Sequence, residues 1–198
     1  MVRDWFVVFV FTYLFLWVLT AHAEPQSALP YRNTLIREAR AEWGLSAPVA
    51  VFAGQIEQES GWNPRACSAY ACGLAQFTPA TAADIAPRLN GNDVFNPAWA
   101  IRALVLYDHD LYGEVDFATR ACDRWAFTLS AYNGGLGNVR KDMALCTASC
   151  DPSLWFGMVA LRSSRNPLAF RENRAYPANI LYKRQLGYTS WGAKVQCP

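Results

Sequence analysis

The chain has 198 residues, of which 53% are apolar and 17% are charged, so it can bury a substantial core and is neither a disordered tail nor a low-complexity or collagen-like array. Its 18 Lys and Arg residues against 16 Asp and Glu residues give a formal net charge of +2. A charge balance this close to even gives no electrostatic indication of a nucleic-acid partner, and no such partner is expected. A single domain is the default for a chain of this length.

The N-terminal residues 1–23 have the pattern of a secretory signal peptide. Arg3 gives a weakly charged start, residues 5–19 form a short apolar run, and Ala-His-Ala at 21–23 is a small-x-small cleavage site. A retained anchor is the alternative, but the run falls short of the roughly 18 residues of a spanning helix. We expect cleavage before Glu24, a mature domain over 24–198 without stable membrane insertion, and a periplasmic or secreted location.

Helical spacing governs the next part of the chain. Apolar residues predict a first helix over about residues 30–43, which Gly44 ends as a C-cap. A second helix is predicted to begin near Pro48. Thr78-Pro79 and Asn96-Pro97 each place a capping residue before a proline at the first helical position, and they predict two further helix starts.

The second half of the chain continues the helical pattern. Residues 98–112 form the longest helical stretch, residues 125–133 a short apolar helix stopped by Gly134-Gly135, and residues 176–186 the last helix. Residues 146–167 look irregular. Sustained period-two alternation is missing, so the fold is predicted to be mainly helical with little or no sheet.

The six cysteines all lie after residue 23, and an even number in an exported chain predicts disulfides. They are Cys67, Cys72, Cys122, Cys146, Cys150 and Cys197. Zinc binding is the alternative. The C-x4-C and C-x3-C spacings and the single mature histidine, His109, support a finger-like zinc site poorly. Several disulfide pairings remain open, because the sequence does not choose among them.

The predicted second helix carries two acidic residues that point in different directions. On a helical wheel Glu59 falls about 20° from Phe52, at the edge of an apolar face, whereas Glu57 lies about 160° from Glu59 and is expected to face solvent. Burial and the helix C-terminus both raise the pKa of Glu59, and they favour the protonated form that a general acid needs. A structural hydrogen bond to backbone amides of a neighbouring loop is an equally good reading of the wheel alone.

Four short blocks then occur in a fixed order. They are Glu-Ser-Gly-Trp-Asn-Pro at 59–64, Gly-Leu-Ala-Gln-Phe-Thr-Pro-Ala-Thr-Ala at 73–82, Ala-Tyr-Asn-Gly-Gly at 131–135 and Glu-Asn-Arg-Ala-Tyr at 172–176. Together they resemble the soluble lytic transglycosylase (SLT) family, over roughly residues 35–186. The resemblance implies a lysozyme-like catalytic domain of the goose-lysozyme or SLT type, mainly helical and here stabilised by disulfides.

The resemblance also implies roles for six residues. Glu59 matches the single catalytic acid/base of the family. Ser68 matches the serine that orients this glutamate and the substrate N-acetyl group, and Gln76 matches the glutamine that lines the glycan groove. For Gln76 the alternative role is that of a cap or turn residue.

The remaining three residues come from the third and fourth blocks. Tyr132 and Asn133 match the pair that contacts the sugar at the cleavage point, and Tyr176 matches the tyrosine whose hydroxyl approaches the catalytic carboxyl. Alternative roles are a turn residue for Asn133 and ordinary core aromatics for the two tyrosines.

The sequence departs from the family pattern near the second block. Ala75 and Thr78 stand where methionines are common, which should widen the groove wall. The segment 59–73 is one residue shorter than usual and contains Cys67 and Cys72, which suggests a local disulfide that tightens the loop presenting Ser68. These departures affect the substrate preference and the alignment of Ser68, and none of them removes a catalytic group.

The mechanism implied by the resemblance needs only one carboxyl group. Asp84 and Asp93 have no spacing that aims them at Glu59, and Asp93 reads as a turn residue. In the family, the substrate supplies the nucleophile for cleavage of the β-1,4 bond between N-acetylmuramic acid and N-acetylglucosamine. The product is a 1,6-anhydromuramoyl end, and the reaction needs no metal and no cofactor.

Two other functions are compatible with the same residues. One is a goose-type muramidase, which hydrolyses the same bond and needs a second carboxylate. The other is a non-catalytic peptidoglycan-binding component of an envelope-spanning machine. Peptidoglycan glycan strands are the expected partner in every case, and the residues do not distinguish a conjugation, secretion or phage apparatus from cell-wall turnover.

Overall fold

A computed structural model describes residues 24–147 and 149–198, and it confirms a mainly helical fold. The predicted signal peptide over residues 1–23 lies outside the described residues. The α-helices of the described part are α1 (Arg32–Trp43), α2 (Val49–Ser60), α3 (Pro79–Leu89), α4 (Pro97–Glu114), α5 (Ala121–Gly134), α6 (Leu136–Ala144) and α7 (Pro167–Tyr182). Short 3-10 helices are η1 (Gln26–Tyr31), η2 (Val159–Leu161) and η3 (Arg184–Tyr188).

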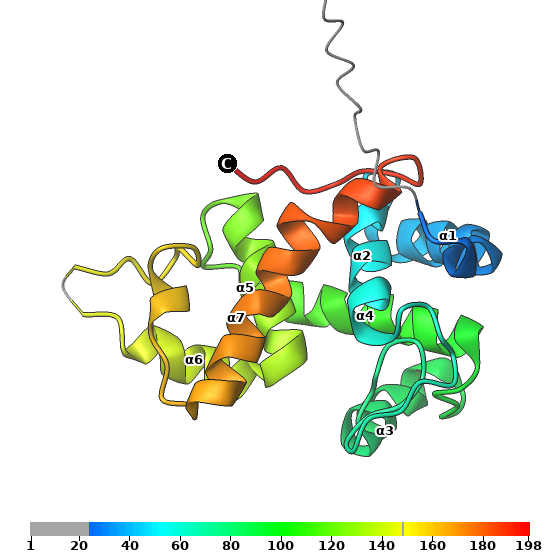
Figure 1. Ribbon diagram of the computed structural model, residues 1–198, viewed down its shortest axis with the longest axis horizontal. Coiled ribbons are helices and arrows are strands. Elements are labelled where there is room, and N and C mark those ends of the chain that lie inside the picture. Colours follow the sequence, from blue (N-terminus) through cyan, green and yellow to red (C-terminus); the bar gives the residue numbers. More distant parts are fainter. Residues whose placement is uncertain (1–23, 148) are drawn as a thin grey trace, which may run out of the picture.

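The helices α2, α4, α5 and α7 occupy the middle of the molecule (Figure 1). Helix α1 packs beside α2 and α4, α3 lies next to α4, and α6 lies at the opposite side, against α5. Within the described ranges no β-strand forms, and pairing is limited to isolated bridges of Cys72 with Cys67 and with Phe77. None of the helices in the described part of the chain is long and apolar enough to cross a membrane.

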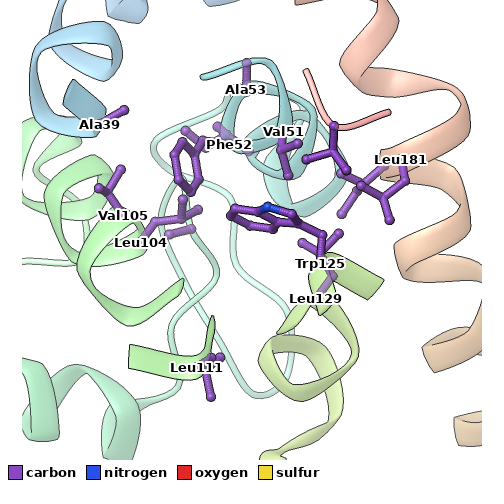
Figure 2. Packing of buried hydrophobic residues seen from close by; sticks show 14 of the residues in the cluster. Ala39, Val51, Phe52, Ala53, Leu104, Val105, Leu111, Trp125, Leu129 and Leu181 are labelled. Atoms are coloured by element: carbon purple, nitrogen blue, oxygen red, sulfur yellow. The ribbon is translucent and has the colours of Figure 1, made fainter. Parts of the chain in front are cut away.

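The core brings α2, α4, α5 and α7 together around aromatic side chains. Figure 2 shows Phe52 of α2 beside Trp125 of α5, with Leu104 of α4 and Leu181 of α7 around them. The rings of Phe52 and Trp125 pack edge to face with 5.6 Å between their centroids. Residues 49–56 of α2 are buried, whereas residues 57–60 are only partly buried. Helix α2 therefore leaves the core in its last turn, the turn that carries Glu59.

The predicted proline-led helix starts are confirmed at α3 and α4. The Thr78 side chain accepts a hydrogen bond from the Thr81 amide, and the Asn96 side chain accepts from the amides of Ala98 and Trp99. These bonds satisfy backbone donors that the first turn of a helix leaves free.

The last helix was predicted too short at its N-terminal end. Helix α7 begins at Pro167, whereas the sequence pattern placed its start at Tyr176. Asn166 caps it by accepting hydrogen bonds from the amides of Leu168 and Ala169. Asn166-Pro167 repeats the signal of Asn96-Pro97, and it was missed because the surrounding residues lack a strong apolar stripe. The C-terminal part predicted as helical up to residue 186 passes into η3 after Tyr182.

Two further differences lie around α5. This helix begins at Ala121, four residues before the predicted start, and α6 at Leu136–Ala144 was not predicted. Gly135, with φ of 83°, is both the C-cap of α5 and the N-cap of α6. The predicted stop at Gly134-Gly135 is confirmed, but a second helix follows it directly. Within the predicted irregular range 146–167, the described residues up to 166 form no regular element apart from η2, and Pro167 begins α7.

Three disulfides confirm the prediction from the cysteine count. They join Cys67 to Cys72, Cys122 to Cys197 and Cys146 to Cys150. The first closes the loop that follows α2, as its spacing suggested. The second ties the C-terminal tail to the start of α5, across 75 residues of sequence. With all six cysteines paired, the alternative of zinc ligation is excluded for this state of the chain.

Candidate active site

A groove with a cavity volume of about 470 Å³ lies between the last turn of α2, the loop after it, α4, α5 and α7. All six residues that the sequence singled out line this groove: Glu59, Ser68, Gln76, Tyr132, Asn133 and Tyr176. They come from four separate parts of the chain. The fold therefore brings the four sequence blocks to one place.

Glu59 lies in the last turn of α2, two residues before Gly61, which caps the helix in the left-handed conformation with φ of 58°. The Tyr176 hydroxyl, from α7, donates a hydrogen bond to Glu59 Oε1. The pKa of Glu59 is raised from 4.5 to about 7, chiefly by burial; the negative charge of Glu172 also raises it, and the Tyr176 hydrogen bond acts in the opposite direction. A carboxyl with a pKa near 7 exchanges its proton readily at neutral pH, which suits a group that acts as acid and then as base.

The two predicted tyrosines have different tasks in the structure. Tyr132, on α5, donates from its hydroxyl to the Ala75 carbonyl oxygen at 2.7 Å, and so fixes the 73–78 loop against α5. Burial raises the pKa of Tyr132 and of Tyr176 well above 10, and the nearby charge of Glu59 acts in the same direction. Both hydroxyls therefore stay neutral donors at physiological pH. Tyr176 is the one that reaches Glu59.

Asn133 is held by a buried amide network. Asn173 Nδ2, from α7, donates to Asn133 Oδ1 at 2.9 Å and to the Ser130 carbonyl at 2.9 Å. Ser130 Oγ donates to Asn173 Oδ1 at 2.7 Å. This network joins α5 to α7 and orients the Asn133 amide, whose own N–H groups lie outside it.

Gln76 and Ser68 are engaged within their own loop. Gln76 has φ of 48°, and its Nε2 donates to the carbonyls of Gly73 at 2.9 Å and Ala66 at 3.0 Å. Ser68 is exposed, and its Oγ accepts from the Ala71 amide at 3.1 Å and donates to the Ala71 carbonyl at 3.3 Å. Ser68 therefore lines the groove without a hydrogen bond to Glu59, and its predicted action on the glutamate stays a prediction.

The loop geometry explains the glycine of the second block. Gly73 has φ of 84°, and a Cβ at this position would collide with the Val94 carbonyl. Such a close backbone approach in the left-handed region favours glycine. The contact between Gly73 and Val94 keeps the 73–78 loop close to the Val94 backbone. Gln76 and Thr78 of this loop line the groove.

Glu57 does not face solvent as the wheel suggested. Arg184 of η3 donates from Nη1 to Glu57 Oε1 at 2.6 Å and from Nε to Gln58 Oε1 at 2.7 Å. The Glu57 side chain is 28% exposed. The wheel correctly separated it from Glu59, but it could not show that η3 covers this side of α2.

Among the groove residues that carried no assigned role in the sequence are Tyr70, Tyr107, Glu172 and Asn179. Glu172 stands in the fourth block, four residues before Tyr176, so its position on the same face of α7 was readable. Tyr70 lies between the paired cysteines of the 67–72 loop. Tyr107 gave no signal, because an aromatic residue in the apolar stretch 98–112 is expected in the core.

The two aspartates considered as second carboxylates do not line the groove. Asp93 Oδ1 accepts from the amides of Phe95 and Asn96, both at 3.2 Å, which confirms its role as a turn residue. Asp84 is exposed on α3. The groove carboxyl next to Glu59 is that of Glu172.

Comparison with known proteins links this geometry to a family. The profile described as "Transglycosylase SLT domain" matches residues 35–149, more than half of the chain. The match contains α2, the disulfide-closed loop and the 131–135 block.

Among relatives, the chain is 36% identical over 99 residues to the membrane-bound lytic murein transglycosylase F of Maricaulis maris, covering 50% of this chain and 20% of the relative. To the protein of the same name from Pasteurella multocida it is 29% identical over 153 residues, covering 76% of this chain and 28% of the relative. The chain thus spans between a fifth and about a quarter of these relatives.

Solved structures of lytic transglycosylases are similar to this one. The 70 kDa soluble lytic transglycosylase of Escherichia coli is 26% identical with a TM-score of 0.56, over 82% of this chain and 25% of that one. An inactive mutant of the lytic transglycosylase Slt from Pseudomonas aeruginosa is 21% identical with a TM-score of 0.64, over 85% of this chain and 26% of that one, which shows the fold alone. These likenesses confirm the lysozyme-like fold of the SLT type, and with the profile match they show that the chain belongs to the transglycosylase SLT domain family.

Proposed function

We propose that this chain is a peptidoglycan lytic transglycosylase in which Glu59 acts first as acid and then as base. The observation that supports this most strongly is the Glu59 carboxyl, with its pKa raised to about 7, in a groove where Tyr176 donates to it. The substrate is the β-1,4 bond between N-acetylmuramic acid and N-acetylglucosamine.

In the first step, protonated Glu59 donates its proton to the glycosidic oxygen. The bond from that oxygen to C1 of the muramoyl residue breaks, while the oxygen of the same residue's N-acetyl group forms a bond to C1. The intermediate is an oxazolinium ion, and Glu59 is now a carboxylate that faces this positive charge. The Tyr176 hydrogen bond stabilises the carboxylate form.

In the second step, the Glu59 carboxylate removes the proton of the muramoyl C6 hydroxyl. The C6 oxygen forms a bond to C1, and the bond from C1 to the N-acetyl oxygen breaks. The product is a 1,6-anhydromuramoyl end, Glu59 is protonated again, and no water is consumed.

The surface around the groove suits a polymer. A cavity of about 340 Å³ adjoins it on the side of Ser68 and Tyr70, and one of about 350 Å³ adjoins it on the side of Asn133 and Glu172. Each of these cavities shares lining residues with the central groove. Several sugar units thus find space on both sides of the reacting bond.

We place this activity in the periplasm or outside the cell, after removal of residues 1–23. Three disulfides support an oxidising compartment. A conjugation, secretion or phage apparatus in the envelope remains a candidate partner. The direct test of the activity is release of soluble muropeptides from purified sacculi by the disulfide-bonded chain.

The pH dependence of kcat should reflect the pKa of Glu59 and its hydrogen bond with Tyr176. The first step needs protonated Glu59, so kcat should fall as pH rises through about 7. In Tyr176→Phe the hydrogen bond that lowers this pKa is lost, so the falling limb should move up by about one pH unit, and kcat should drop about tenfold. Rates on soluble glycan strands between pH 5 and 9 measure both effects. A limb that stays in place would contradict the role given to Tyr176.

The Tyr70 ring should pack against the bound glycan. It is 82% exposed in the disulfide-closed 67–72 loop and lines the central groove and the neighbouring cavity. Aromatic faces pack well against the apolar faces of sugar rings, so Tyr70→Ala should raise KM about fivefold and leave kcat within about twofold. Leu168→Ala, which truncates a side chain that is 68% exposed on α7, is the matched control. Equal KM values for the two variants would refute this role.

A second candidate function is hydrolysis by a muramidase, and the position of Glu172 favours it. Glu172 lines the groove, and its charge raises the pKa of Glu59. A muramidase would use Glu172 as the base that activates water, and Glu172→Gln would then lose activity about 100-fold or more. A lytic transglycosylase loses little in this variant, and the falling limb of its pH profile moves down.

A further inference from the structure

Two buried polar residues below the groove take no part in the proposed steps. Gln55 of α2 and Asp108 of α4 both have no exposed surface. Gln55 Nε2 donates to Asp108 Oδ1 at 3.4 Å. In the described part of the chain this is the one hydrogen bond between α2 and α4. Gln55 lies four residues before Glu59, one turn earlier on the same face of α2.

Each member of the pair has an oxygen without a partner. Gln55 Oε1 and Asp108 Oδ2 are both buried, and within the described residues neither makes a hydrogen bond. Both atoms are acceptors if Asp108 is ionised. A proton on Asp108 Oδ2 would turn this atom into a donor, and Gln55 Oε1 is the buried acceptor of the pair that lacks a donor.

The surroundings favour the neutral acid. The titratable groups that face Asp108 are Glu59 from α2, Tyr107 from its own helix, Tyr132 from α5 and Tyr176 from α7. None of them is a cation, and among the described residues no Lys, Arg or His forms an ion pair with Asp108.

The neighbouring His109 on α4 pairs instead with Glu42. Burial raises the pKa of Asp108 well above 3.8, the Gln55 hydrogen bond lowers it, and the charge of Glu59 raises it further. A buried carboxylate with no cation is strongly destabilising.

We propose that Asp108 is a positioning residue, protonated at neutral pH, which forms a closed acid–amide pair with Gln55 and so fixes the Glu59 turn of α2 over α4. The pair adds no charge below the groove. Glu59 can therefore become a carboxylate in the second step without a second buried carboxylate nearby. The positioning role rests on the proposed function, whereas the protonation state does not.

The protonation state is tested by stability, without any assay of activity. An acid that is neutral in the folded protein and ionised in the unfolded chain loses stability as pH rises above its ordinary range. The ratio of the unfolding equilibrium constants of wild type and Asp108→Asn should therefore rise about tenfold per pH unit between pH 5 and 7. Urea unfolding with the disulfides intact measures it. Asp110→Asn, which removes an exposed carboxyl of α4, is the control. The ratio of the unfolding equilibrium constants of wild type and Asp110→Asn should not change with pH over this range.

The positioning role is tested by kinetics. Asn can make both hydrogen bonds to Gln55, so Asp108→Asn should retain the wild-type kcat within about twofold and the same pH profile. Asp108→Leu can make neither bond, and it should lower kcat about tenfold with little change in KM. If Asp108→Leu does not fold, Gln55→Met, which removes the amide at similar length, takes its place with the same expectation.

Each outcome decides one part of the proposal. A stability ratio for Asp108→Asn that stays constant with pH, or a pH profile that shifts down in this variant, would mean that Asp108 is ionised and would overturn the proposal. A wild-type kcat in Asp108→Leu, or in Gln55→Met where Asp108→Leu does not fold, would overturn the positioning role. A wild-type chain that cleaves no glycan would refute the proposed function and the positioning role together, and the stability ratio would still decide the protonation state.

Discussion

Glu59→Gln is expected to reduce cleavage of peptidoglycan by about 1,000-fold or more. The amide keeps the size of the side chain and can still accept a hydrogen bond from Tyr176, but it can neither donate the acid proton nor remove the C6 proton. Loss of a general acid or base alone costs about 100- to 10,000-fold, and here one group serves both steps. Release of muropeptides from sacculi, with a zymogram in parallel, measures the loss.

The matched control is Glu57→Gln, two residues away in the same turn. Glu57 pairs with Arg184 outside the groove lining and should change the rate by less than about twofold. Because burial raises the pKa of Glu59 to about 7, the wild-type carboxyl opposes folding increasingly as pH rises from 4.5 to 7. Glu59→Gln should therefore be at least as stable as wild type at pH 7. Equal activity of Glu59→Gln and wild type would refute the catalytic assignment, and equal inactivity would favour a non-catalytic binding protein.

Arg174→Met is expected to lower the free energy of unfolding by about 3–5 kcal/mol. Arg174 Nη2 lies 2.7 Å from Oδ2 of Asp142, whose side chain has no exposed surface. Arg174 also donates to the carbonyls of Ala160 at 2.8 Å and Arg162 at 2.6 Å. Removal of one partner of a buried ion pair leaves an uncompensated charge, which is the costly case. Arg165 Nη2, 3.4 Å from Asp142, compensates only in part.

Urea unfolding of wild type and variant at pH 7 measures this effect. Arg171→Met, on the exposed side of the same helix, is the control and should change stability by less than about 0.5 kcal/mol. Asp142→Asn in the Arg174→Met background should recover part of the loss, since it removes the unpaired charge. Similar losses for Arg174→Met and Arg171→Met would show that the buried pair does not stabilise α7 against α6.

Helix boundaries were predicted best where a local sequence signal determines them without tertiary contacts. Capping residues followed by proline located the starts of α3 and α4, and a Gly after a helix located its end. The same signal at Asn166-Pro167 was missed because the residues that follow, with Leu168 exposed, show no apolar stripe. Helix α6 was not predicted for a related reason, because it is short and Val139 is its one buried apolar residue.

The candidate site was predicted better than the helix boundaries. The wheel placed Glu59 at the edge of the buried face, and the four blocks led to four further groove residues: Gln76, Tyr132, Asn133 and Tyr176. The pairing of Gln55 with Asp108 was out of reach, because it depends on how α2 crosses α4. A single hydrogen bond between residues 53 positions apart leaves no periodic trace in the sequence. Likewise Glu57 was assigned to solvent because nothing local reveals that η3 packs there.

In the proposed reaction the glycan, and not water, supplies the oxygen that ends up on C1 of the muramoyl residue. Digestion of sacculi in water enriched with heavy oxygen, followed by mass spectrometry of the released muropeptides, tests this directly. The account predicts muramoyl ends that are lighter by one water than reducing ends and carry no heavy oxygen. Reducing ends with one heavy oxygen each would contradict it and would identify the chain as a muramidase.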